Sequence, residues 1–332
     1  MSVVDQKGGG GVGQELQDFL RTFPAEFAAG WQQLPNKALF FILLAVWLVL
    51  FQFLGNSTFG YIPTASIFRW MYAAYTAQNS DDSHGLLIPI VVLVLLYWRR
   101  DKLLGMVHRT WWPGLLIFVV ALALHIVGYV VQQPRVSIVA LFTGIYGLMG
   151  LIWGREWLRL SFFPYFLLIF CVPLGSLAEP ISFPLRLLVT KIVVVLSHTV
   201  LGINVVREGT RIFTPDRTFE YEIAAACSGI RSLIATFAIS TIYAFLVFQK
   251  SWKRLLLIGA AIPFAVLGNV FRMMTIVMAA EAFGQSAGAY VHENGILSLL
   301  PYIPAIGGLL ILGHWLREPE TTDGPRERER ET

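Results

Sequence analysis

The stretch that decides the fold is ALFFILLAVWLVLFQFL, residues 38–54, in which no residue is charged. As a helix rising about 1.5 Å per residue it would be about 26 Å long, close to the hydrocarbon thickness of a bilayer at about 30 Å. Similar apolar runs continue along the chain as far as Trp315. This excludes a protein with a single membrane anchor, and we expect a chain that crosses the membrane several times.

The composition predicts the same class. Apolar residues make up 56% of the 332 residues, charged residues only 14%, and the mean hydropathy is +0.64. Soluble domains have about 45–50% apolar and about 25% charged residues. These values exclude an ordinary cytosolic enzyme, a disordered chain and a secreted domain built on disulfides. The two cysteines, Cys171 and Cys227, are far apart in the sequence and do not by themselves indicate a disulfide.

We expect an all-α polytopic membrane protein with about eight transmembrane helices. The candidate spans are residues 38–54, 84–98, 112–131, 136–153, 159–175, 229–248, 255–280 and 296–315. The seventh is too long for one straight crossing, so we expect a kink or an end outside the hydrocarbon. The apolar segment 181–203 carries Arg186, Lys191 and His198, and we interpret it as an amphipathic helix in the membrane interface.

Lysine and arginine residues predict the orientation, because cytoplasmic loops of membrane proteins carry an excess of them. With the N-terminus inside, 16 of the 25 fall on the cytoplasmic side, and Arg231 and Arg272 fall within spans. The outer side holds the remaining seven: Arg69, Arg135, Arg186, Lys191, Arg207, Arg211 and Arg217. This bias predicts both termini in the cytoplasm. It also accounts for a pI near 9.1 without a nucleic-acid partner.

The expected organisation is a cytoplasmic tail at residues 1–36, a transmembrane domain at 37–317 and a disordered cytoplasmic tail at 318–332. We expect no signal peptide before the first span and no further domain after the eighth. The one sizeable outer loop spans about 176–228. Its second half alternates polar and apolar residues around the turn Thr214-Pro215-Asp216-Arg217, which predicts a small β-hairpin.

Cys227 lies in the sequence ACSGIRS, where the outer loop meets the sixth span. Ser228 favours helix entry, so we expect Cys227 at or just before a helix N-terminus, where free N–H groups and the helix dipole favour a thiolate. Arg231 follows four residues later on the same helical face and adds positive charge. The alternative is a buried small apolar residue, which is our interpretation of Cys171 within the fifth span.

Two further motifs lie at the same predicted outer boundary. An arginine within an apolar run costs roughly 2.5–3.5 kcal/mol on insertion scales, so Arg272 either has a function or anchors topology and packing. Asn269 shares its helical face, and His292 lies in the short outer turn between the seventh and eighth spans. A loop histidine is usually a surface residue, but the topology brings this one to the boundary that holds Cys227. Cysteine and histidine can form a thiolate–imidazolium pair, and arginine can stabilise an oxyanion.

Asp81, Asp82 and His84, at the outer entry of the second span, could together bind a metal ion. The chain contains no HExxH or CxxC arrangement, however. We therefore expect no metal and no cofactor. For His84, a role in contacting substrate or in supporting the site is the better interpretation.

These motifs together resemble the exosortase/archaeosortase family. The matching pieces are ACSGIRSL at 226–233, NVFRM at 269–273, His292 with Gly295, and SHGLLIP at 83–89 followed by Trp98-Arg99-Arg100. The likeness runs from about residue 38 to residue 315, which is most of the chain.

The resemblance implies a multispanning cysteine transpeptidase or protease. Its substrates would be membrane-anchored exported proteins with a C-terminal sorting signal, of the PEP-CTERM type in Gram-negative bacteria. Cys227 would be the nucleophile, Arg272 the cation that orients substrate or stabilises the transition state, and His292 the acid/base. Supporting or substrate-binding positions would be His84, Ser228, Arg231 and Asn269. The location would be the inner membrane, with the site facing the periplasm, and the lipid bilayer rather than nucleic acid as the other partner.

Two other functions stay open from the residues alone. A transporter, or an assembly factor for exported polysaccharide, could use Arg272 and Asn269 along a substrate path, although the polar residues gather at one boundary rather than at the midplane. An acyltransferase that acts on lipid would use Cys227 with a different donor. Replacing Cys227 by serine separates a transporter from a thiol enzyme, because a transporter should tolerate the change.

Overall fold

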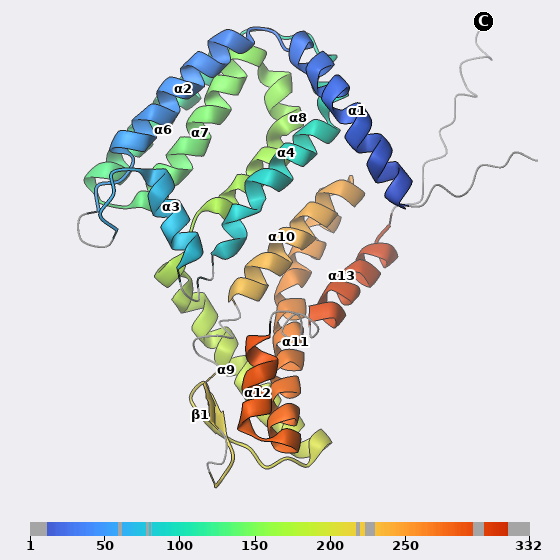
Figure 1. Cartoon of the computed structure of the whole chain (residues 1–332). Coiled ribbons are helices and arrows are strands. Elements are labelled where there is room, and N and C mark those ends of the chain that lie inside the picture. Colours follow the sequence, from blue (N-terminus) through green and yellow to red (C-terminus); the bar gives the residue numbers. More distant parts are fainter. Residues whose placement is uncertain are drawn as a thin grey trace, which may run out of the picture. The chain divides into compact units, whose positions relative to one another are not determined.

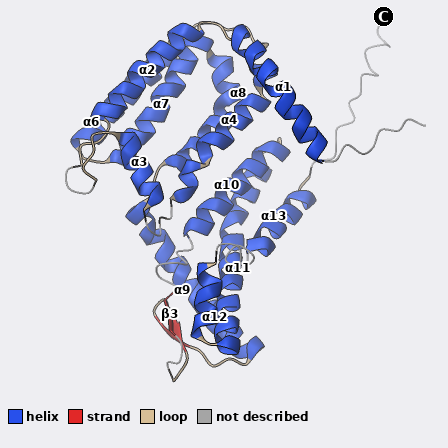
Figure 2. Cartoon of the chain, viewed as in Figure 1, coloured by secondary structure: helices blue, strands red, loops and turns tan. Residues whose placement is uncertain are grey.

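The computed structural model of the chain describes residues 12–58, 62–77, 80, 82–216, 220–222, 230–294 and 302–317. Helices dominate these residues (Figures 1 and 2). The internal contacts divide the chain into two compact units. Unit 1 comprises Met1–Tyr72 and Leu87–Val172, and unit 2 comprises Ala73–Leu86 and Pro173–Thr332.

All regular secondary structure in the described part of unit 1 is helical. Its elements are α1 (Val12–Gln33), α2 (Lys37–Leu54), most of α3 (Ile67–Thr76), α4 (Ile88–Trp98), α5 (Arg100–Leu104), α6 (Pro113–Val130), α7 (Pro134–Trp153), α8 (Arg155–Phe166) and the 3-10 turn Leu167–Cys171. Both α6 and α7 begin at a proline. The missing proline N–H has no partner in a first helical turn anyway, and its fixed φ suits that position.

Helices α6 and α7 pack closely because glycines line their contact. A Cβ atom on Gly147 would lie 2.8 Å from the backbone nitrogen of Phe118 and 2.9 Å from the carbonyl oxygen of Gly114. Helix α2 adds the buried indole of Trp47, whose Nε1 donates to the Leu141 carbonyl at 3.0 Å. Small residues that let backbones approach are typical of helix pairs in membranes.

Replacing Gly147 by leucine should therefore destabilise unit 1 by about 3 kcal/mol, because the new side chain meets backbone atoms that cannot move aside. Thermal unfolding of the purified protein in detergent measures the change. Gly259→Leu is the control, since nothing lies within 4 Å of the Cβ position of that residue. Equal melting temperatures for the two variants would contradict the close α6–α7 contact.

Unit 2 combines helices with a small sheet. Its elements are the 3-10 turns Ser83–Leu86 and Gly175–Ala178, α9 (Glu179–Leu196) with the π turn Ser197–Leu201, β1 (Val206–Glu208), β2 (Arg211–Phe213), β3 (Glu220–Glu222), α10 (Ile230–Val247), α11 (Ser251–Phe283), α12 (Gln285–Glu293) and α13 (Ile303–Trp315). The antiparallel strand order is β1-β2-β3, and Arg211 pairs with Glu222. The predicted hairpin is thus confirmed as β2–β3, and β1 extends it.

Helix α11 is the axis of unit 2. Its 33 residues would extend about 50 Å, well beyond a hydrocarbon layer of about 30 Å, which agrees with the expectation for the seventh span. Two apolar clusters surround it. The first half packs against α10 and α13 through Phe248, Leu257 and Leu309. The second half packs against α9 and the sheet, through residues that include Val193, Ile212 and Ile276.

The described helices agree with most of the predicted spans. Five segments are long and apolar enough to cross a membrane: Lys37–Leu54, Pro113–Val130, Pro134–Trp153, Ser182–Leu201 and Ser251–Phe283. Shorter apolar helices match the second, sixth and eighth predicted spans: Ile88–Trp98, Leu233–Val247 and Ile303–Trp315. The fourth of the long segments is the helix that the sequence predicted in the membrane interface. Whether it crosses or lies flat, and hence the number of spans, stays a prediction.

The predicted fifth span, 159–175, has a different form. Helix α8 begins earlier, at Arg155, and ends at Phe166, after which a 3-10 turn reaches Cys171. The next residue, Val172, is extended with ψ 111°. Pro173 explains this end, because a residue that precedes proline is disfavoured in the helical conformation.

Candidate functional site

Three helix ends meet at the start of α11. Lys253 Nζ donates to the carbonyl of Leu316, at the end of α13, at 2.7 Å. Arg254 Nε donates to the carbonyl of Phe248, at the end of α10, at 2.8 Å. Each cation thus satisfies a free carbonyl at the negative end of a helix dipole. Helices α10 and α13 therefore both run antiparallel to α11.

Helix lengths place the opposite ends of these helices. From Phe248 back to Ile230, α10 extends about 27 Å, and α11 covers the same distance of about 27 Å between Arg254 and Arg272. The N-terminus of α10 therefore comes to the level of Arg272. Arg231 lies in the first turn of α10. Cys227 and Ser228, which come just before it in the sequence, lie outside the described residues.

Arg272 belongs to a hydrogen-bonded cluster with Asn269 and Tyr302. Its Nη1 donates to the Tyr302 hydroxyl at 3.4 Å, and that hydroxyl donates to Oδ1 of Asn269 at 3.2 Å. Asn269 is buried and the other two are partly buried. The tyrosine ring packs against Gly268, where a Cβ atom would lie 2.9 Å from it. Asn269 and Arg272 share a face of α11, as the spacing predicted.

Tyr302 is the member of this cluster that sequence reasoning missed. It directly precedes α13, 30 residues from Arg272 along the chain. Tyrosine and tryptophan are common where a helix enters the membrane interface. This preference could have indicated Tyr302 as a residue at the outer boundary.

Helix α12 brings His292 back toward the same level. Gly284 ends α11 with φ 86° and ψ 171°, a conformation largely restricted to glycine. Helix α12 follows at once and packs along α11 (Figure 1), with Val291 against the core that includes Met273. His292 and Arg272 are therefore about 12 and about 18 Å from the turn, measured along their helices. The prediction of a short loop at His292 is wrong, because the residues after Gly284 form a helix.

Of the residues Asp81, Asp82 and His84, which precede α4, Asp82 has a structural role. Asp82 is buried, and its carboxylate accepts hydrogen bonds from the backbone N–H groups of Leu174 at 3.0 Å and Gly175 at 3.2 Å. His84 lies half-buried in the 3-10 turn that follows, and Asp81 is outside the described residues. Within the described part of the chain, no three His, Cys, Asp or Glu residues are grouped so that they could hold a metal ion.

Replacing Tyr302 by phenylalanine tests the cluster. The change removes two long hydrogen bonds, together worth about 1 kcal/mol, and should slow a reaction that needs an oriented Arg272 about fivefold. Tyr290→Phe is the control, because the exposed hydroxyl of Tyr290 accepts a hydrogen bond from Nδ2 of Asn294 at 3.3 Å and is not part of the cluster. A substrate-processing rate equal to that of the control would contradict a positioning role for Tyr302.

The fold and this cluster define an all-α, multi-pass membrane protein with a polar site where several helices end. Residues 70–297, more than two thirds of the chain, match the family model described as Transmembrane exosortase (Exosortase_EpsH). The chain therefore belongs to the transmembrane exosortase family, as its motifs predicted. The family gives it a transpeptidase-type role in protein sorting within the membrane, on protein substrates that carry sorting signals.

The matched range contains every candidate site residue predicted from the sequence, whereas Tyr302 falls just beyond it. Neither the curated proteins nor the solved structures gave a match to the chain.

Proposed function

We propose that the protein is a cysteine transpeptidase or protease that cleaves the C-terminal sorting signal of exported, membrane-anchored proteins. The reaction takes place at the outer face of the inner membrane, through a thioacyl intermediate. The signal is of the PEP-CTERM type: a recognition motif, one membrane span and a basic cluster. The substrate's own span lies in the bilayer, so its recognition motif emerges at the level of the site.

Cys227 is the nucleophile of this reaction. Its thiolate sulfur bonds to the carbonyl carbon of the scissile peptide, and the carbonyl oxygen takes up negative charge. Arg272 stabilises that oxyanion. The C–N bond then breaks, and the His292 imidazolium gives its proton to the leaving amine. An amine or water then gives a proton to the neutral His292 imidazole and attacks the thioester, which releases the sulfur as a thiolate and restores the imidazolium.

One observation carries this proposal: the start of α10 and the Arg272–Tyr302–Asn269 cluster come to one level of α11, and the end of α12 comes within about one helical turn of that level. Cys227 is three residues before α10 in the sequence, and His292 belongs to α12, the helix that packs along α11. A helix N-terminus close to an arginine favours a thiolate over a thiol. His84, Ser228, Arg231 and Asn269 support the site or contact the substrate.

Co-expression with a tethered substrate tests the proposal. A reporter that ends in a candidate sorting signal is followed by its change in mobility, and the enzyme is purified to seek an adduct with the reporter. Cleavage should be accompanied by an adduct that hydroxylamine releases, because thioesters react with that nucleophile. Cleavage without any such adduct, under conditions that slow its resolution, would exclude the thioacyl step.

A further inference from the structure

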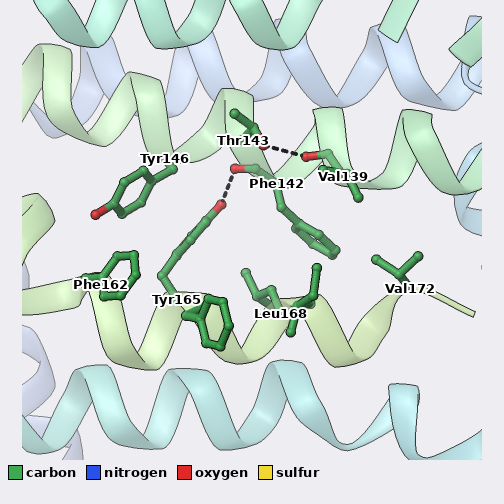
Figure 3. Close-up of a pocket in the computed structure, with 10 residues that line it drawn as sticks. Val139, Phe142, Thr143, Tyr146, Phe162, Tyr165, Leu168 and Val172 are labelled. Atoms are coloured by element: carbon green, nitrogen blue, oxygen red, sulfur yellow. Dashed lines mark hydrogen bonds between the residues drawn. The ribbon is translucent and has the colours of Figure 1, made fainter. Parts of the chain in front are cut away.

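Unit 1 contains an apolar groove of about 180 Å³ between α7 and α8, which is unrelated to the site proposed above (Figure 3). Its polar groups are turned to the protein's own backbone. Thr143 Oγ1 donates to the carbonyl of Val139 at 2.8 Å, and the Tyr165 hydroxyl donates to the carbonyl of Phe142 at 2.7 Å. The groove therefore offers an occupant almost only apolar contacts.

A second pocket of about 360 Å³ adjoins the groove and shares Tyr146 and Phe162 with it. Figure 3 shows these two side chains at one end of the groove and Val172 at the other. The second pocket contains Arg155 and Arg159, from the first two turns of α8. The apolar groove thus leads into a pocket with two cations.

The cationic pocket is suited to an anion. Arg155 has no ion-pair partner among the described residues, and Arg159 is paired with the exposed Glu156 at 2.8 Å. Gly154 precedes the helix and has no side chain that could cap its free N–H groups. Trp111 also lines this pocket, and tryptophan is enriched at the level of lipid headgroups.

The dimensions match one leaflet of a bilayer. Between Arg159 and Ile169 the chain rises about 16 Å, and one leaflet contributes about 15 Å of hydrocarbon. The side chains of Phe162, Phe166 and Ile169 are 50%, 45% and 48% exposed, so this face of α8 is open. An acyl chain that follows this face would bring its headgroup to the two arginines.

We propose that these two pockets form a binding site for one anionic phospholipid. The phosphate lies between Arg155 and Arg159, and one acyl chain lies in the groove between α7 and α8. A helix about 10 Å wide that ran along this length of about 16 Å would occupy roughly 1,300 Å³, whereas the groove has a volume of about 180 Å³. A basic segment of a protein partner would be repelled by the two arginines.

Native mass spectrometry of the delipidated full-length protein tests this site. Phosphatidylglycerol and phosphatidylcholine with the same acyl chains are titrated separately. The first phosphatidylglycerol should bind about 30-fold more tightly, since each arginine near a membrane surface contributes about a fivefold gain for an anionic lipid. Equal affinities for the two lipids would overturn the proposal.

Four variants assign the preference to these residues. R155Q combined with R159Q should reduce phosphatidylglycerol binding to the level of phosphatidylcholine, whereas E156Q should strengthen it, because the carboxylate competes with the phosphate. Ile169→Trp should fill the groove and weaken the binding of both lipids. Lys102→Gln is the control, since this exposed residue of α5 lines neither pocket. The proposal fails if the double variant keeps the wild-type preference. It also fails if glycerophosphoglycerol, the headgroup without chains, competes as tightly as the intact lipid.

Discussion

Replacing Cys227 by alanine is expected to abolish cleavage of a tethered sorting substrate, with a loss of about 10,000-fold or more. Without the sulfur no thioester can form, and Arg272 with His292 can at most polarise the peptide. The assay compares processed and unprocessed reporter at equal enzyme levels. Cys227→Ser should be almost as inactive, because a serine hydroxyl is ionised far less readily than a thiol at neutral pH.

Cys171→Ala is the matched control for this loss. Cys171 is fully buried in the 3-10 turn that follows α8, and a small buried thiol usually serves packing. The alanine variant should therefore process the reporter at a rate close to wild type. Processing by Cys227→Ala would refute the thiol mechanism. Normal processing by Cys227→Ser together with loss of processing in Cys227→Ala would instead indicate that residue 227 has a role that does not need a thiolate.

The uncharged runs of the sequence predicted the membrane helices well. The prediction 38–54 corresponds to Lys37–Leu54, and 112–131 corresponds to Pro113–Val130. Such helices are set by length and by the absence of charge, both of which can be read directly from the residues. The segment 159–175 shows the limit of this approach. Its apolarity continues through Pro173, but the backbone leaves the α-helical conformation after Phe166.

The part of the site around Arg272 was predictable, because burying an arginine in an apolar segment costs free energy. An arginine within an apolar run indicates a functional or structural role. Asn269, three residues earlier, is predicted to share the same face of the helix. Tyr302 could not be found in this way. Its contact with Arg272 depends on the antiparallel register of α13, which Lys253 at one end and Gly268 near the other help to define. Such long-range register leaves no periodic pattern in the sequence.

The misassigned loop at His292 has a related cause. The residues of α12, QSAGAYVHE, are on average only weakly apolar, so the apolar runs of the sequence do not indicate this helix. Helix α12 forms because it packs along α11, where Val291 joins the core. Gly284 makes this packing possible, since its φ of 86° reverses the chain within one residue.

Replacing Arg272 by lysine is expected to reduce cleavage by about 100- to 1,000-fold, the usual effect of removing one oxyanion donor. Lysine keeps the charge but loses the planar guanidinium, which here reaches the Tyr302 hydroxyl at 3.4 Å. The same reporter assay measures the loss. Arg254→Lys is the control on the same helix, because its bond to the Phe248 carbonyl at 2.8 Å caps α10 far from the site.

The two roles open to Arg272 predict different results for this pair of variants. If the arginine only anchored topology or packing, its positive charge would suffice, and Arg272→Lys would cleave the reporter as well as Arg254→Lys does. If Arg272 holds the oxyanion, Arg272→Lys should bind substrate and reach normal levels in the membrane, yet form the thioester slowly. The rate of adduct formation by the purified variant therefore decides between the roles. A wild-type rate would remove Arg272 from the chemistry and leave it as a structural cation.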